Sequence, residues 1–159
     1  MSANETVQNI NPAVIELVNR LQDLSASRRL PAELAEFAYG VAFNYYSQGQ
    51  YESAMQYFAF LTVYRPTETR FLTGLAQTHR QLGNHAEAIR LFSLAGMIEP
   101  LAPEHTLAVA ECELSNQQTA AAFATLQLVI DFCKERSGHD AVLQRASALK
   151  GLIEKPALA

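Results

Sequence analysis

The sequence predicts an all-α fold of tandem helix–turn–helix repeats, three in number, with a flanking helix at each end. Alanines recur every 34 residues, glycine and proline recur at fixed positions between them, and abundant alanine and leucine favour helix. The repeated alanines are Ala42, Ala76 and Ala110 in one set and Ala54, Ala88 and Ala122 in the other. One register kept over three copies indicates a stack of similar units rather than an irregular helical bundle.

The alanines and the large apolar residues that follow them have distinct expected roles. Small side chains allow two helices to cross closely, since anything larger would push the backbones apart. Four residues after the second alanine of each unit lie Phe58, Phe92 and Leu126. We expect these three side chains to fill the space between repeats.

Glycine and proline mark the expected helix ends. Gly49 and Gly83 follow the first helix of their units, where the left-handed conformation that ends a helix is easiest for glycine. Pro66 and Pro100 should end the second helix, because proline lacks the backbone N–H and clashes with the preceding turn. The third copy departs from both rules, with Gln117 and Lys134 at these positions.

The register divides the chain into a flank of residues 1–34, repeats at 35–68, 69–102 and 103–136, and a closing segment of residues 137–159. In the first flank a helix is expected after Asn11-Pro12, with an apolar stripe of Val14, Leu17, Val18, Leu21 and Leu24. After Ser137-Gly138 we expect a closing helix over about 139–155, with these residues on one side: Val142, Leu143, Ala146, Leu149 and Leu152/Ile153. Terminal helices of this kind cover the core face that a repeat array leaves exposed.

Charge and composition exclude several function classes. The formal net charge is −4, and the densest basic spot is the pair Arg28-Arg29, so the basic stripe that nucleic-acid binding requires is missing. No basic segment followed by an apolar run opens the chain, and no uncharged apolar stretch approaches the roughly 18 to 20 residues that span a bilayer. We therefore expect a soluble, cytoplasmic protein without a signal peptide.

The residue types that carry chemistry show no catalytic or metal-binding spacing. The histidines, His79, His85, His105 and His139, form no HExxH motif, and no P-loop, GxSxG or GxGxxG occurs. Cys112 and Cys133 lack a CxxC partner and are expected to be two reduced, buried thiols. The sequence therefore predicts neither an enzyme nor a bound metal or cofactor.

A repeat of this length with these alanines is the tetratricopeptide (TPR) pattern. In such stacks the first helix of each unit lines a concave surface, and positions 2, 5, 9 and 12 of the unit face it. These positions are Glu36, Tyr39, Phe43 and Tyr46 in the first repeat, Arg70, Thr73, Gln77 and Arg80 in the second, and Glu104, Leu107, Glu111 and Leu114 in the third.

Two features of this surface suggest a site for a polypeptide segment. Tyr39, Phe43 and Tyr46 form one aromatic stripe, and tyrosine rings combine large contact area with a polar tip, which suits a peptide groove. The alternative is that the stripe packs on the N-terminal helix as ordinary core. Arg70 and Arg80 either anchor carboxylates or carbonyls of a bound segment or belong to a solvated charged face.

Several short strings sharpen the family. The first repeat reads AYGVAFNYY at residues 38–46 and GQYESA at residues 49–54. The second repeat has Arg70-Phe71 and Gly74-Leu75, and the third has Ala110-Glu111-Cys112. Together with the helical first flank, these strings resemble the class II chaperones of bacterial type III secretion, the TPR proteins that guard translocator subunits. The resemblance covers roughly residues 10 to 155.

The resemblance implies a chaperone of the bacterial cytoplasm that keeps hydrophobic translocator proteins soluble and apart until secretion. A short extended client stretch with spaced hydrophobic and proline residues would lie in the concave groove. By position, Tyr39, Phe43 and Tyr46 would form the main pocket wall, continued by Arg70, Thr73, Gln77, Leu107 and Glu111. Family members often dimerise through the N-terminal helix, which the apolar stripe Val14, Leu17, Val18 and Leu21 matches.

Three alternatives stay open at this point. Thr73 and Gln77 are polar, and Asn116-Gln117-Gln118 replaces the usual glycine turn, so an effector or a needle component remains an alternative client. A generic TPR adaptor is the second alternative. The adaptors that grip the C-terminal carboxylate of a heat-shock protein need Lys and Asn where this chain has Tyr39 and Phe43, which disfavours that form. A scaffold for another bacterial assembly is not excluded.

Overall fold

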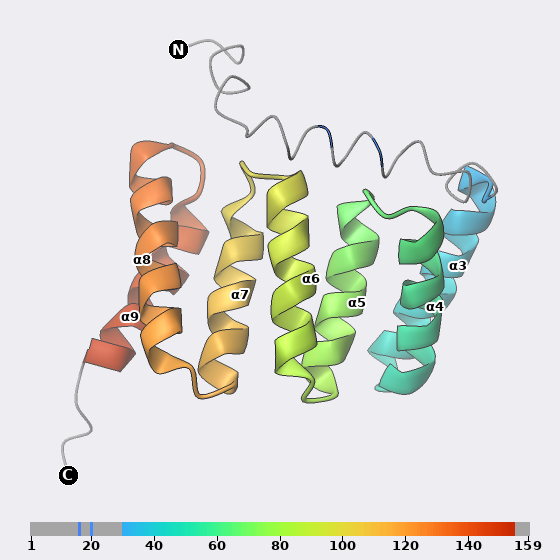
Figure 1. The fold of residues 1–159 in the computed structure, drawn as a ribbon, viewed down its shortest axis with the longest axis horizontal. Helices are drawn as coiled ribbons and strands as arrows, with labels where there is room; N and C mark the ends of the chain where they lie inside the picture. The colour runs from blue at the N-terminus through green and yellow to red at the C-terminus, as the bar shows by residue number, and fades with distance from the viewer. Residues whose placement is uncertain (1–15, 17–19, 21–29, 155–159) are drawn as a thin grey trace.

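A computed structural model describes Glu16, Arg20 and residues 30–154, and nearly all of this part of the chain is helical. Its long helices are α3 (Ala32–Ser47), α4 (Tyr51–Tyr64), α5 (Thr69–Gln81), α6 (His85–Ile98), α7 (Pro103–Ser115), α8 (Thr119–Glu135) and α9 (Asp140–Glu154). Figure 1 shows them standing side by side in chain order, and no strand occurs among the described residues. The predicted all-α repeat fold is confirmed.

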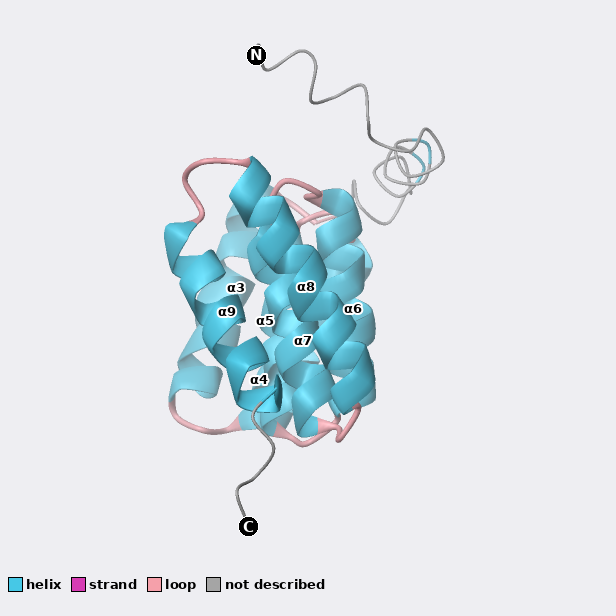
Figure 2. Cartoon of the chain, turned by 90° about the vertical axis from the view of Figure 1, so that its left-hand side faces the viewer, coloured by secondary structure: helices cyan, strands magenta, loops and turns pink. Residues whose placement is uncertain are grey.

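The helices pack as antiparallel pairs, α3 with α4, α5 with α6 and α7 with α8, and each pair packs on the next. Beyond consecutive neighbours, α3 contacts α5 and α7 contacts α9. Figure 2 looks along the array from the end where α8 and α9 lie. The first helices of successive pairs are therefore linked across the repeats, α3 to α5 by packing and α5 to α7 through the Arg80–Glu111 contact, as a shared concave surface requires.

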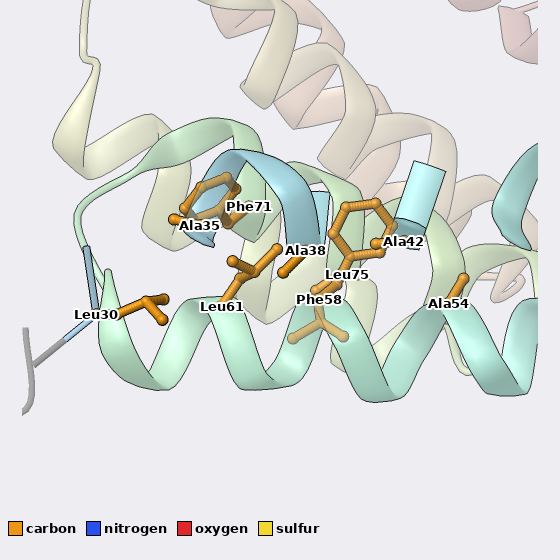
Figure 3. Packing of buried hydrophobic residues seen from close by; sticks show 9 residues of the cluster. All are labelled: Leu30, Ala35, Ala38, Ala42, Ala54, Phe58, Leu61, Phe71 and Leu75. Carbon is orange, nitrogen blue, oxygen red and sulfur yellow. The ribbon is translucent and has the colours of Figure 1, made fainter. Parts of the chain in front are cut away.

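The recurring alanines lie where two helices cross. Ala42, Ala54, Ala76, Ala88, Ala110 and Ala122 are all 0% exposed. Phe58, Phe92 and Leu126 are buried beside them, so the predicted filling of the space between repeats is confirmed. Figure 3 shows the first of these cores, in which Phe58 of α4 and Phe71 of α5 meet the alanines of α3.

The turns within the three repeats share one backbone conformation. Gly49, Gly83 and Gln117 have φ values of 75°, 77° and 61°. In the first turn Gln50 N–H donates to the Tyr45 carbonyl at 2.9 Å, and bonds of the same pattern recur at Asn84 and Gln118. This pairing ends a helix by satisfying its last carbonyls, and it needs one residue with positive φ. The third repeat thus keeps the turn without the glycine.

Proline sets the length of the second helix in the first two pairs. α4 ends at Tyr64 and α6 at Ile98, each two residues before a proline, and each has 14 residues. α8 has Lys134 at the equivalent place and continues to Glu135, for a length of 17 residues. The prediction that Pro66 and Pro100 end their helices is confirmed. In the third repeat, which lacks the proline, the helix is longer.

The closing helix packs on the third repeat through Val142 and Ala146, which are buried, and through Leu143, Leu149 and Ile153, which are partly buried. Leu152 is 71% exposed, so the expectation that it could share this side was wrong. It follows the buried Ala146 by six residues, about 240° around the helix, and so points away from the third repeat. The residues of the predicted N-terminal stripe lie outside the described part of the chain.

Both cysteines are free and buried, as predicted. Burial raises the pKa of the Cys112 thiol and also that of Cys133. Since the thiolate is the reactive form, neither group is disposed to nucleophilic chemistry. In the described part of the chain, every helix is too short or too polar to cross a bilayer.

Candidate functional site

A cavity of about 250 Å³ opens between the first helices of the first and second repeats. Its lining consists of Tyr39, Phe43, Tyr46, Phe58, Arg70, Thr73, Gly74 and Gln77. Six of these eight residues are ones that the sequence placed on the concave surface. The structure therefore brings together the aromatic stripe of α3 and the polar positions of α5 in one site, which we call the aromatic cavity.

The rings of the aromatic cavity form a continuous wall. Tyr39 stacks on Phe43 with 6.5 Å between ring centroids and meets Phe58 edge-on at 6.0 Å. It also contacts Phe71 at 5.6 Å. Tyr39 therefore belongs partly to the core, as the alternative interpretation of the stripe held, whereas Phe43 is 56% exposed. Core and groove meet at Tyr39, and Phe43 extends the wall into solvent.

Arg70 forms one edge of this cavity. Its Nη1 donates to Glu36 Oε2 at 2.9 Å and its Nη2 to the other oxygen, so the pair is bidentate. The guanidinium lies over the Tyr39 ring, 5.2 Å from the centroid, and contacts Phe71 in the same way. The hydrogen bonds from Arg70 lower the pKa of Glu36, and those to Glu36 raise the pKa of Arg70. This arrangement closes one end of the cavity with a neutralised pair.

The floor of the cavity depends on Gly74. A Cβ at this residue would lie 2.7 Å from Cδ1 and from Cζ of the buried Phe58 ring. Real Cβ atoms do not approach a ring so closely, so any side chain here would displace Phe58 or fill the cavity. Phe58 and Gly74 are site residues that the analysis of concave positions missed, because Phe58 comes from the second helix and glycine offers no side chain.

The remaining predicted groove residues, Leu107 and Glu111, lie outside the aromatic cavity. Leu107 is only 6% exposed and packs in the core with Ala110 and Leu126, so it does not face the surface as expected. Residues of α8 and α9 in the same core cluster cover that side chain. Glu111 binds Arg80 and Arg145, so both of its oxygens have protein partners.

A second cavity, of about 410 Å³, lies over a different face of α3 and α4. It is lined by Leu34, Phe37, Ala38, Gln56, Tyr57 and Phe60. Phe37 is 70% exposed, and Leu34, Tyr57 and Phe60 are exposed as well. An apolar patch of this kind on one end of a repeat array is typical of a contact surface.

The described residues hold no cluster of three or more His, Cys, Asp or Glu side chains suited to a metal ion. One cluster joins an acid and a histidine: Glu99 accepts hydrogen bonds from Thr69 and His105, the latter at 2.9 Å. Thr69 begins α5 and His105 lies in the first turn of α7, so this contact ties helix ends together. We therefore interpret it as a structural contact between helix ends.

Fold and site together define a helical-repeat protein with a preformed groove walled by aromatic rings. A family model described as tetratricopeptide repeat matches residues 35–67. The chain is 27% identical over 125 residues to low calcium response locus protein H of Yersinia pestis. The aligned residues cover 79% of this chain and 74% of the relative.

Solved structures agree with this relationship. The type III secretion translocator chaperone SycD of Yersinia enterocolitica superposes with a TM-score of 0.71 at 26% identity, over 80% of this chain and 88% of that chain. A type III secretion complex from Aeromonas hydrophila matches with a TM-score of 0.75 at 22% identity, over 91% and 96%, and supports the fold. The chain is thus a homologue of low calcium response locus protein H, and it shares the fold of the type III secretion translocator chaperone SycD.

Proposed function

We propose that this protein is a cytoplasmic chaperone of a bacterial type III secretion system. It binds an extended, hydrophobic segment of a translocator protein in its concave groove and keeps that protein soluble before secretion. The observation that carries the proposal is the aromatic cavity between α3 and α5, lined by six residues predicted from the sequence alone. One structure of the similar chaperone SycD contains a peptide of the translocator YopD, which supports a polypeptide as the occupant.

The residues of the cavity divide the work of binding. Phe43 and Tyr46 present apolar surface from α3, and Tyr39 fixes that surface to the core through its contacts with Phe58 and Phe71. Thr73 and Gln77 supply polar groups that suit the backbone of an extended segment. A groove preformed by packed helices lowers the ordering cost of binding.

Leu107 and Glu111 take supporting roles in this proposal. Leu107 holds α7 against α8 from beneath the surface, and Glu111 engages Arg80 and Arg145. The aromatic contacts with the client therefore concentrate on the first two repeats. No step of this function requires a cofactor or a covalent reaction, and we assign the protein a binding role without catalysis.

The test uses two phenylalanines of α3 that point to different faces. Phe43→Ala removes a wall of the aromatic cavity, whereas Phe37→Ala removes an even more exposed ring from the second cavity. Each variant is co-expressed with the products of neighbouring genes and purified by affinity, and the retained proteins are identified by mass spectrometry. We expect Phe43→Ala to lose a hydrophobic secreted client by about tenfold or more, and Phe37→Ala to retain it.

The outcome also separates the alternatives. Equal recovery with both variants would remove the aromatic cavity from the binding site. Recovery of a secreted effector or needle component in place of a translocator would change the client and keep the groove. If only folded cytosolic proteins bind, the generic adaptor becomes the better interpretation.

We also propose a homodimer formed through the apolar stripe Val14, Leu17, Val18 and Leu21, which lies outside the described residues. A SycD structure is described as an alternative dimer, so a similar protein self-associates. Replacing Leu21 with Glu places a charge on the stripe, and we expect the dimer to dissociate. Light scattering at matched concentration reports the mass, and an unchanged mass would exclude this stripe as the interface.

A further inference from the structure

Beyond the aromatic cavity, two arginines share a single carboxylate. Arg80 Nη1 donates to Glu111 Oε2 at 2.8 Å, and Arg145 Nε donates to Glu111 Oε1. The Glu111 side chain is 11% exposed, whereas that of Arg145 is 62% exposed. The three side chains come from α5, α7 and α9, and we call them the arginine pair with its carboxylate.

This cluster carries an unbalanced positive charge. Two guanidinium groups face one carboxylate, and each arginine spends a single N–H of its five on Glu111. Among the described residues, neither arginine forms an ion pair with any other acid. Arg70 differs, because Glu36 binds it in a bidentate manner and Glu68 lies 3.6 Å from its Nε. The pair therefore retains donors for an anion that Arg70 lacks.

The cluster lies on the same side of the array as the aromatic cavity. Glu111 occupies the repeat position held by Phe43 and Gln77, both of which line that cavity. Arg80 is equivalent to Tyr46, another lining residue, and it lies one turn along α5 from Gln77. Arg145 reaches Glu111 from α9, so the closing helix borders the same surface.

We propose that the arginine pair binds an acidic side chain of the client, at a fixed distance from the apolar residue that enters the aromatic cavity. Packed helices lie about 8 to 10 Å apart, and the cluster is centred about one and a half helix spacings from the cavity. An extended chain advances about 3.3 Å per residue. The client segment thus carries Asp or Glu about four or five residues from its apolar anchor.

This inference rests on the proposed function and assigns a second role to the closing helix. α9 covers the core of the third repeat through Val142 and Ala146, and it also presents Arg145 to the groove. Glu111 orients both guanidinium groups, so little side-chain entropy is lost when a second carboxylate arrives. The apolar half of the groove supplies contact area, and the charged half selects among apolar segments.

The first experiment is a selection with random twelve-residue peptides displayed on phage. The targets are the wild-type protein, Arg145→Gln, Phe43→Ala, and the control Arg90→Gln, which changes an exposed arginine of α6 that pairs with Glu87. We expect wild type and the control to enrich peptides with an apolar residue and an acid four or five positions away. Arg145→Gln should keep the apolar enrichment and lose the acidic one, and Phe43→Ala should lose both.

A second measurement gives the size of the effect. Two fluorescein-labelled copies of an enriched peptide differ only in Glu or Gln at the acidic position. We expect wild type to bind the Glu peptide about five- to tenfold more tightly, with the preference falling in 0.5 M NaCl, because a partly exposed charge pair is screened. Arg145→Gln should show less than about twofold preference, and Arg145→Lys, which keeps the charge, should retain part of it.

Each result decides the matter. Enrichment of apolar peptides without acids, or equal affinity of wild type for the two labelled peptides, would overturn the arginine site and leave the proposed groove intact. Enrichment of nothing by the wild type would remove the groove and this inference together. Circular dichroism of Arg145→Gln and Arg145→Lys confirms that a lost preference comes from the charge and not from unfolding.

Discussion

The first and third repeats have the same backbone turn but different residues in it. Gly49 adopts φ 75° and Gln117 adopts φ 61°, and the same pair of hydrogen bonds follows each. Glycine enters this region freely, whereas glutamine does so at a cost of about 1 to 2 kcal/mol. Because Ala110 and Ala122 still cross at zero exposure in the third repeat, the packing of the helices imposes the turn. The glycine makes it easier to form.

The second helices of these repeats differ in length, although the helix crossings are the same. Pro66 ends α4 after 14 residues, and Lys134 lets α8 continue to 17. After the longer helix, α9 begins 37 residues after the start of α7, whereas α7 begins 34 residues after the start of α5. Proline thus sets where a helix ends, whereas the small alanines set where two helices cross.

The groove surfaces of the two repeats differ most. The first repeat presents rings, and the third presents Glu111 between two arginines. Positions on the concave face are free to differ because no neighbouring helix fills them, in contrast to the buried alanines. The comparison teaches that one repeat scaffold holds an apolar half and a charged half of a single site.

The largest expected effect comes from the equivalent core residues Phe58 and Leu126. Phe58→Ala should lower the free energy of unfolding by about 3 to 5 kcal/mol and Leu126→Ala by about 2 to 5 kcal/mol, because both side chains are buried. Phe58 also lines the aromatic cavity, so only its variant should weaken client binding when still folded. Urea unfolding and binding to the purified client measure the two effects, and equal binding loss in both variants would contradict the division into halves.

Much of this architecture could be predicted from the sequence, because repetition averages out local ambiguity. The three aligned copies predicted the alanine crossings, the turns at Gly49 and Gly83 and the helix ends before the prolines. The structure confirms all three features. The fold class therefore followed from spacing alone. A single repeat would not have distinguished the crossings from ordinary helix composition.

The site was harder to predict because position in a repeat does not fix burial. The sequence placed Leu107 on the concave surface by equivalence with Tyr39 and Thr73, yet α9 and α8 help bury it. Arg145 was missed because the closing helix was expected only to cover the core, although Arg145 follows the concave residue Glu111 by 34 residues. Gly74 was missed since its contribution is an absent side chain, which only the nearby Phe58 ring reveals.

The next largest effect concerns the helix stop. Lys134→Pro should destabilise the protein by about 3 kcal/mol, because proline removes a helical N–H from α8 and clashes with the turn that precedes it. Pro66→Lys, the reverse exchange in the first repeat, should change stability by much less, since α4 already ends at Tyr64. Thermal unfolding followed by circular dichroism compares them. Equal losses would mean that the repeats obey the same rule at this position.

The joints between helices predict a difference in acid sensitivity. Glu99 and Arg65 are equivalent residues: Arg65 donates to the Leu30 carbonyl at 2.8 Å, and Glu99 accepts from His105 and Thr69. The hydrogen bond from His105, with a smaller effect of Thr69, lowers the pKa of Glu99 below its ordinary value of 4.5. A carboxyl with a lowered folded-state pKa contributes stability that is present above 4.5 and lost as the pH falls through the folded-state pKa.

We therefore expect Glu99→Gln to lower stability by about 1 kcal/mol or less at pH 6, as partly exposed pairs do, and to approach the wild type as the pH falls through the lowered folded-state pKa of Glu99. Arg65→Gln should differ from the wild type by the same amount across this range, since a guanidinium stays charged. Urea unfolding at a series of pH values measures both. A Glu99→Gln deficit that persists at low pH would show that the joint acts through shape and not through charge.

The smallest effect tests the turn itself. Gln117→Gly should stabilise the protein by about 0.5 to 1 kcal/mol, because glycine adopts φ 61° without the strain that a side chain brings, less the entropy that glycine loses on folding. Gly83→Gln, at the equivalent turn, should destabilise by a similar amount, since no atom lies within 4 Å of an added Cβ there and only the backbone φ of 77° opposes it. Urea midpoints of the two variants should move in opposite directions by similar shifts. If Gln117→Gly shifts nothing, the Gln117 side chain contributes a contact that offsets its strain, and the third turn is then a variant with its own stabilisation and not a weakened copy of the first.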